Sequence, residues 1–196
     1  MMTAFPDVPP ADALNGDLVG ASRRGAGLRE AGIVFVVQGT KKFRDRVRGV
    51  AAAPDEVSTT ALGNWFSTVM FWRPHVALFV SETTLLPVLV PFAPAVSLLE
   101  RFPATLADVL CAHGVDRALI SRELAQMRDS RLVKTTNRSV VGVMNEFAFL
   151  AEVARDRSGE LLSLSLQLAA TPCGPLSTRH VSPDRELMAL VADIAG

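Results

Sequence analysis

The pattern of apolar and polar positions predicts short buried strands in the first part of the chain. Residues 33–37 form a run of mostly β-branched side chains, which favours a buried strand. Two further apolar runs, 76–80 and 85–90, flank the polar residues 81–84, and this spacing predicts an antiparallel hairpin. Because both runs are apolar at nearly every position, we expect both faces of the hairpin to be covered. Pro87 cannot donate a hydrogen bond, so its strand should be an edge or carry a bulge.

Apolar side chains at spacings of three and four predict helices in the second half of the chain. The clearest is 139–154, and Pro103 suits the first turn of another helix over 104–113. Asp116 can cap the next helix. The predicted helices are 41–47, 104–113, 116–127, 139–154, 161–169 and 183–194. We interpret 62–72 as a helical turn leading into a strand and 132–134 as a further short strand.

These elements predict an α+β fold, in which a small, mostly antiparallel sheet is packed with several helices. A three-layer α/β arrangement is the alternative. Residues 31–196 should form a single globular domain, because the periodic pattern begins near Ile33. Residues 1–30 are rich in Pro and Gly and show little periodicity, so we interpret them as a mobile leader.

Composition narrows the class of protein. Of 196 residues, 49% are hydrophobic and 20% charged, which excludes a disordered chain. Lys and Arg total 20 and so do Asp and Glu, which disfavours wholesale binding of polyanions. The start of the chain lacks a signal-peptide pattern, and polar residues and Pro87 interrupt the most apolar stretch. We therefore expect a cytoplasmic protein with two free thiols and no membrane partner.

Several motifs resemble an uncharacterised bacterial family known only as a domain of unknown function. Three of them are Gly39-Thr40-Lys41-Lys42-Phe43, Asn137-Arg138-Ser139 and Thr171-Pro172-Cys173-Gly174-Pro175, and further similarity lies at 62–66 and 82–91. The similarity spans residues 33 to about 190. It implies a shared fold and no settled activity.

Positive charge gathers where the first predicted strand meets its helix. Residues 22–48 hold eight Lys or Arg and two Asp or Glu. A helix start presents unpaired N–H groups, which suit a phosphate, a nucleotide or a nucleic-acid backbone. The candidate anion-binding residues are Thr40, Lys41, Lys42, Arg44 and Arg138. The alternative is a solvated basic helix. The Gly-rich phosphate-loop pattern is absent, so the sequence does not support an NTPase.

The predicted helix after Arg138 carries the weak catalytic candidates. Glu146 could act as an acid or base, and Asn145 could position a substrate by hydrogen bonding. Gly142 would allow a ligand or another backbone to approach closely. The alternative is an ordinary capped amphipathic helix with a polar tie to a loop.

Cysteine, histidine and tryptophan give weaker signals. Cys173 could act as a nucleophile beside a histidine, but the sequence places no histidine next to it, and a half-buried free thiol is the alternative. The three histidines are scattered, so we predict no metal site and no cofactor. Trp65 and Trp72 fit core anchors better than base-stacking platforms.

Three hypotheses about function follow. The first is a binding or regulatory module that contacts an anionic ligand or nucleic acid through its basic helix, 41–48. The second is a small enzyme acting on a phosphate-bearing or nucleic-acid substrate. The third is a structural protein that self-associates, for example as a homodimer, through an exposed hairpin edge near Pro87.

Overall fold

The computed structural model describes residues 33–53 and 56–195. The predicted leader, 1–30, lies outside this range. The strands are β1 (Val34–Gly39), β2 (Val50–Ala51), β3 (Trp65–Met70), β4 (Val76–Ser81), β5 (Pro87–Pro91) and β6 (Asp129–Lys134). The helices are α1 (Lys41–Arg44), α2 (Leu98–Ala112), α3 (Arg117–Ala125), α4 (Arg138–Ser158), α5 (Leu161–Ala169) and α6 (Pro183–Ala195), with short 3-10 turns at Ala95–Ser97 and Gly174–Leu176.

The described strands form one mixed sheet in the order β2-β6-β1-β3-β4-β5. β1 lies parallel to both β3 and β6, whereas β4 is antiparallel to β3 and β5. The α+β class is thus confirmed, but the expectation of a mostly antiparallel sheet was wrong. Strands that are neighbours in the sequence pair only in the β3–β4–β5 meander. The central strand β1 instead pairs through long crossover connections, and such parallel strands are buried on both faces.

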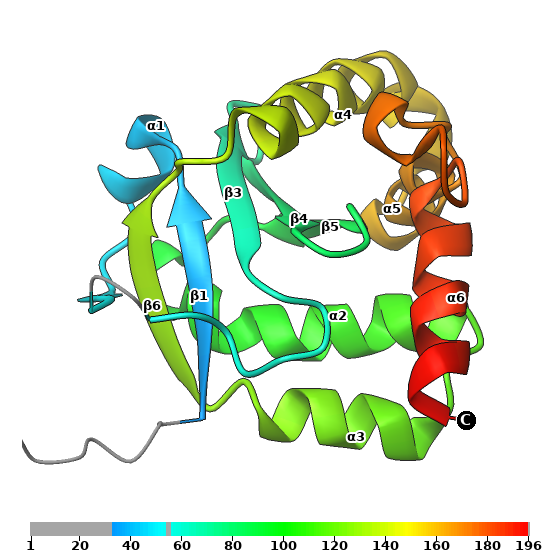
Figure 1. Ribbon diagram of the computed structural model, residues 1–196. Coiled ribbons are helices and arrows are strands. Elements are labelled where there is room, and N and C mark those ends of the chain that lie inside the picture. Colours follow the sequence, from blue (N-terminus) through cyan, green and yellow to red (C-terminus); the bar gives the residue numbers. More distant parts are fainter. Residues whose placement is uncertain (1–32, 54–55, 196) are drawn as a thin grey trace, which may run out of the picture. The chain divides into compact units, whose positions relative to one another are not determined.

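Strand direction decides where the loops gather. β5 is antiparallel to β4, and β4 is antiparallel to β3, so β5 runs in the same direction as β3, β1 and β6. Their last residues, Pro91, Met70, Gly39 and Lys134, therefore lie at one edge of the sheet. We call this the carboxyl edge. In Figure 1 it is the upper end of the sheet, where α1 and the start of α4 are found.

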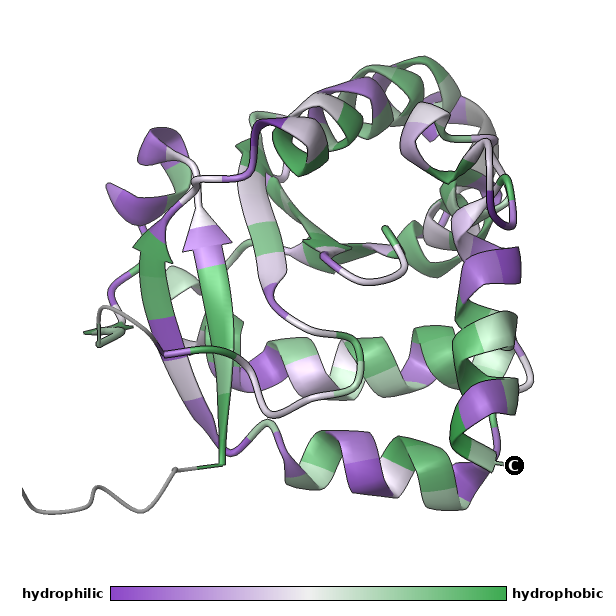
Figure 2. Ribbon diagram, in the orientation of Figure 1, coloured by the Kyte–Doolittle hydropathy of each residue, from purple (hydrophilic) through white to green (hydrophobic). Residues whose placement is uncertain are grey.

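Helices cover both faces of the sheet (Figure 1). On one face, Phe43, Phe102 and Leu187 pack in a single cluster with alternate residues of the strands. On the other face, Phe147 of α4 and Leu164 of α5 pack against the remaining strand positions. Figure 2 shows the strands as mainly hydrophobic and α1 as mainly hydrophilic. No helix in the described part of the chain is long and apolar enough to span a bilayer.

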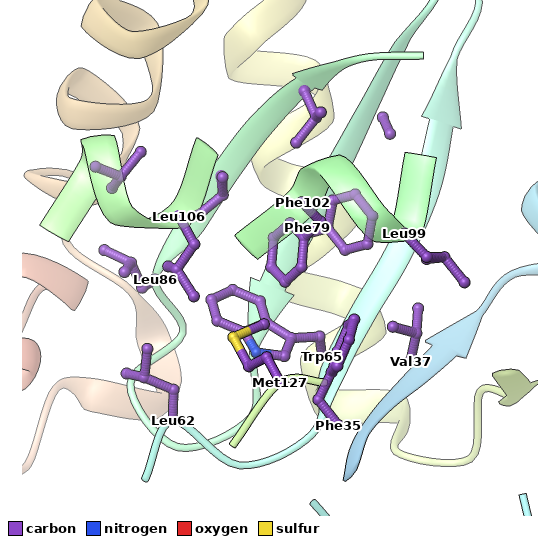
Figure 3. Close-up of a cluster of buried hydrophobic side chains, with 14 of the residues drawn as sticks. Phe35, Val37, Leu62, Trp65, Phe79, Leu86, Leu99, Phe102, Leu106 and Met127 are labelled. Carbon is purple, nitrogen blue, oxygen red and sulfur yellow. The ribbon is translucent and has the colours of Figure 1, made fainter. Parts of the chain in front are cut away.

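Trp65 anchors the first of these clusters. Its side chain is fully buried, and its ring meets Phe102 edge to face at a centroid distance of 4.8 Å. Phe79 stacks on the same Phe102 at 4.1 Å, as Figure 3 shows. The prediction of a core role for Trp65 is confirmed. Its indole N–H, however, has no hydrogen-bond acceptor among the described residues.

The predicted helices are present, but most differ in extent, and α4 continues to Ser158, four residues beyond its predicted end. The Asp116 carboxylate accepts the N–H of Ala118 and caps α3 as expected, and α5 has the predicted bounds. α1 is shorter than predicted and ends at Arg44, although Phe43 and Val47 are both buried. α2 begins at Leu98, so Pro103 lies inside the helix rather than in its first turn.

Burial explains why α2 continues through Pro103. Leu98, Leu99 and Phe102 precede the proline, and all three are buried in the core. Each buried side chain of this size contributes about 1.5–3 kcal/mol. Together they outweigh the roughly 3 kcal/mol that an interior proline costs.

The hairpin of β4 and β5 is confirmed, and β5 is an edge strand as Pro87 indicated. The edge is not exposed, however. Residues 87–90 are buried, and the hydroxyl of Ser165 on α5 accepts the N–H of Leu89 at 2.9 Å. The expectation of an open edge near Pro87 was therefore wrong, because α5 lies along it.

Candidate functional site

At the carboxyl edge, the connections that follow the adjacent strands β1 and β6 leave toward opposite faces of the sheet. After β1 the chain turns to the face covered by α2, since Phe43 packs in that cluster. After β6 it turns to the opposite face, where Val140 and Phe147 of α4 are buried. In open sheets, ligands bind where the connections of two adjacent parallel strands leave to opposite sides. The edge between β1 and β6 has this geometry.

Hydrogen bonds tie the end of β1 to its neighbours on both sides of this switch point. The backbone N–H of Thr40 donates to the carbonyl of Ser67 at 2.9 Å, and its hydroxyl lies 3.1 Å from that of Thr68. Thr40 therefore ties β1 to β3, and its side chain makes no capping hydrogen bond to α1. On the other side, the buried Gln38 accepts the backbone N–H and the hydroxyl of Thr136 through its side-chain oxygen. The two strand ends are thus held in one rigid frame.

Two of the predicted anion-binding residues have partners within the chain. The Lys41 ammonium forms an exposed ion pair with Asp45, four residues later, at a distance of 2.7 Å. The Arg44 side chain folds back and donates its Nε–H to the carbonyl of Gly39 at 3.1 Å. Arg44 is half-buried and closes the end of β1. It therefore has a positioning role in addition to its charge.

Lys42 and Arg46 lie over an aromatic ring. Phe71, the first residue after β3, is 51% exposed. The Lys42 Nζ lies 5.5 Å and the Arg46 guanidinium carbon 4.8 Å from its ring centroid. Partial burial lowers the pKa of Lys42. His75 meets the other side of the cluster, with its ring edge-on to Phe71 at 5.4 Å.

The start of α4 brings Arg138 to the same edge. The Asn137 side-chain oxygen accepts the N–H groups of Ser139 and Val140, so this residue caps α4. Arg138 follows it and is exposed. The structure therefore brings Thr40, Lys41, Lys42, Arg44 and Arg138 to one edge of the sheet, although Arg138 lies on the far side of the switch between β1 and β6.

The catalytic candidates lie elsewhere on α4. Asn145 and Glu146 are exposed and follow Arg138 by seven and eight residues, which is about 12 Å along a helix axis. Burial, and then the charge of Glu146, raise the pKa of Cys173 to about 11. Glu146 thus neighbours the buried thiol rather than the cations of the carboxyl edge. A thiol in this state is not a nucleophile at neutral pH.

A groove of about 670 Å³ opens beside Phe71. Residues 71–76 form one wall, and the junction of α4 and α5 forms the other. Trp72 lies in it, half-buried, and donates its indole N–H to Glu152. The Arg155 guanidinium carbon lies 5.7 Å from the Trp72 ring. Trp72 thus packs against the second hydrophobic cluster but is not fully buried in it, so the expected core role holds only in part.

Sequence reasoning missed Phe71, Trp72 and His75 as site residues. The available signal was the sequence Phe71-Trp72-Arg73-Pro74-His75, in which two consecutive aromatic residues are followed by an arginine and a histidine in the connection between two strands. Its position at the carboxyl edge follows only from the parallel pairing of β1 with β3. Among the described residues, no group of three or more His, Cys, Asp or Glu is arranged to hold a metal ion.

The fold and this edge define an α+β domain with a mixed sheet and a polar, cation-bearing carboxyl edge. Residues 36–186 match the profile of a family described as a domain of unknown function (DUF6933). The chain belongs to this family, as its motifs implied. No curated protein and no solved structure is significantly similar to the chain.

Proposed function

We propose that this protein is a binding module that holds an anionic partner at its carboxyl edge through the basic segment, residues 41–48. The observation that carries the proposal is the placement of Lys42 and Arg46 together over the exposed ring of Phe71. Among the described residues, neither cation is paired with a carboxylate. Two charges held side by side, neither in a direct ion pair with a described carboxylate, attract an anion.

The other predicted residues support this surface in different ways. Thr40 and Arg44 fix the end of β1 against β3. Lys41 is exposed, and a stronger anion could displace its Asp45 partner, because exposed ion pairs contribute only about 0–1 kcal/mol. Arg138 adds charge from the α4 side. Binding is favoured over catalysis because Asn145 and Glu146 lie two helical turns away from these cations.

Retention on immobilised heparin tests the proposal, since heparin is a polyanion without bases. We expect the wild type to be retained at low salt and to elute as salt rises. Lys42→Ala/Arg46→Ala should elute at clearly lower salt. Arg117→Ala/Arg122→Ala removes the same charge from exposed positions on α3 and should elute like the wild type. Equal elution of the two double variants, or no retention at low salt, would contradict the proposal.

A further inference from the structure

The end of β3 presents two consecutive aromatic rings to opposite sides of the sheet. Phe71 contacts Lys42 and Arg46 from the α1 side. Trp72 contacts Glu152 and Arg155 on α4, which covers the other face. Each ring therefore carries at least one cation within 6 Å of its centroid. A ligand that crosses the carboxyl edge here would meet an aromatic surface on each side. Arg155 also pairs with Glu152 and Asp156, so the positive charge open to an anion is concentrated on the Phe71 side.

The groove connects these two sides. Phe71, Trp72, Arg73 and His75 line its β3 side, and the acidic Asp156 and Glu160 lie on the α4–α5 side. Its volume of about 670 Å³ lies within the range typical of ligand sites. It is open to solvent rather than enclosed, and the basic segment adjoins it through Phe71. An extended chain could therefore enter from the α1 side and continue toward α4.

Rings interleaved with cations are the chemistry by which proteins hold single-stranded nucleic acid. Bases stack on aromatic side chains and guanidinium planes, while Lys and Arg contact the phosphates. A duplex keeps its base faces stacked internally and could use only the charges. An acidic peptide would also use the charges, but it would leave both rings without a planar partner.

We infer that the anionic partner is a single-stranded nucleic acid, whose bases stack at Phe71 and Trp72 and whose phosphates contact Lys42, Arg46 and Arg73. The inference rests on the proposed function and names the partner of the same edge. In this inference the rings of Phe71 and Trp72 stack on bases, whereas binding by charge alone would not need the rings. Binding should therefore depend on ring shape at position 71 and not merely on the cations around it.

Fluorescence anisotropy of labelled 12-nucleotide oligo(dT) and oligo(rU) tests this with the full chain. Phe71→Leu keeps apolar volume but removes the ring, and should weaken both complexes roughly five- to a hundredfold. Phe71→Tyr keeps the ring and should bind like the wild type. Phe71 is half-exposed, so both variants should fold, which thermal melting checks. Comparing the two oligonucleotides shows whether DNA or RNA is preferred.

Heparin separates this inference from the proposed function. Phe71→Leu should weaken oligonucleotide binding far more than heparin retention, because heparin has no bases to stack, whereas Lys42→Ala/Arg46→Ala should weaken heparin and oligonucleotide binding alike. Oligonucleotide binding that is indifferent to Phe71→Leu, or equally tight binding of a duplex or of poly-glutamate, would overturn the inference and leave the proposed function standing. Failure to bind heparin and every oligonucleotide at low salt would overturn both.

Tryptophan fluorescence gives a second readout. Trp65 is fully buried and Trp72 lies in the groove, so quenching by an added oligonucleotide reports on Trp72. We expect quenching in the wild type and its loss in Trp72→Phe, which retains a ring. Quenching that persists in Trp72→Phe would place the nucleic acid away from the groove and overturn the assignment.

Discussion

Leu89 donates its backbone N–H to the hydroxyl of Ser165, which joins the middle of the edge strand β5 to helix α5 across 2.9 Å. N–H groups alternate in direction along an edge strand. Phe92 donates inward to His75, so residues 87, 89 and 91 face outward. Pro87 and Pro91 have no N–H to offer. Ser165 therefore takes the one outward donor of β5, and no donor remains with which another strand could pair.

Ser165→Ala should destabilise the protein by about 1–3 kcal/mol, because it leaves the buried N–H of Leu89 without an acceptor. Urea unfolding measures the change. Ser163→Ala is the matched control, since Ser163 is exposed on the same helix and its loss should cost less than about 0.5 kcal/mol. Equal effects of the two substitutions would show that the hydrogen bond contributes nothing.

Gly39→Ala should destabilise the fold by about 1–3 kcal/mol through overpacking. An added Cβ would lie 2.8 Å from Cγ of Arg44 and 2.9 Å from a ring carbon of the buried Phe43. The matched control is Gly142→Ala in α4, where a Cβ meets nothing within 4 Å. Because alanine favours helix, that variant should be more stable by up to about 1 kcal/mol. Thermal and urea unfolding of the pair should thus shift in opposite directions.

Glu123 should make stability fall as pH rises. Burial raises the pKa of this carboxyl, although the N–H groups of Ala61 and Leu62 donate to it and partly oppose the shift. The folded state therefore binds the proton more tightly than the unfolded state. This contribution to stability is complete below the ordinary pKa of 4.5 and is lost as pH rises through the raised value.

Glu123→Gln cannot titrate. Its amide oxygen can accept from one of the two backbone N–H groups, but the other N–H then faces the amide NH2 group, which cannot accept. It should be less stable than the wild type at pH 4, and the difference should narrow toward pH 7. Urea unfolding across this range measures it, with the exposed Glu100→Gln as control. A difference that widens with pH would mean that the pKa is lowered instead.

The two cysteines should differ in reactivity. Cys173 is buried and has a pKa of about 11, so roughly one thiol in a thousand is ionised at pH 8. Cys111 is exposed. Iodoacetamide should therefore alkylate Cys111 in the folded protein and spare Cys173, as peptide mass spectrometry would show. Alkylation of Cys173 at a similar rate in Cys111→Ser would refute the assignment.

Local signals in the sequence were sufficient for most of the helices. α4 could be predicted because its apolar stripe and the Asn137 cap act within a few residues of each other. The Asp116 cap of α3 is local in the same way. The start of α2 was predicted wrongly from Pro103, because proline is favoured in the first turn of a helix. The burial of Leu98 and Leu99 against a sheet that is distant in the sequence decides where α2 begins.

The sheet and the candidate edge depend on distant pairing. Nothing near Val37 indicates that Trp65 and Leu132 will lie on either side of it. The basic segment could be located from charge alone. Phe71, by contrast, could be assigned to the same surface only after the parallel register brought the end of β3 beside that of β1.

The position of β1 has a consequence for how the protein is made. Val34 pairs with Asp129, about 95 residues later in the chain. At a synthesis rate of about 5–20 residues per second, β1 leaves the ribosome roughly 5–20 seconds before its second neighbour exists. During that interval the edge of β1 that pairs with β6 presents unpaired N–H and C=O groups. The nascent chain should therefore be most prone to non-native strand pairing until β6 emerges.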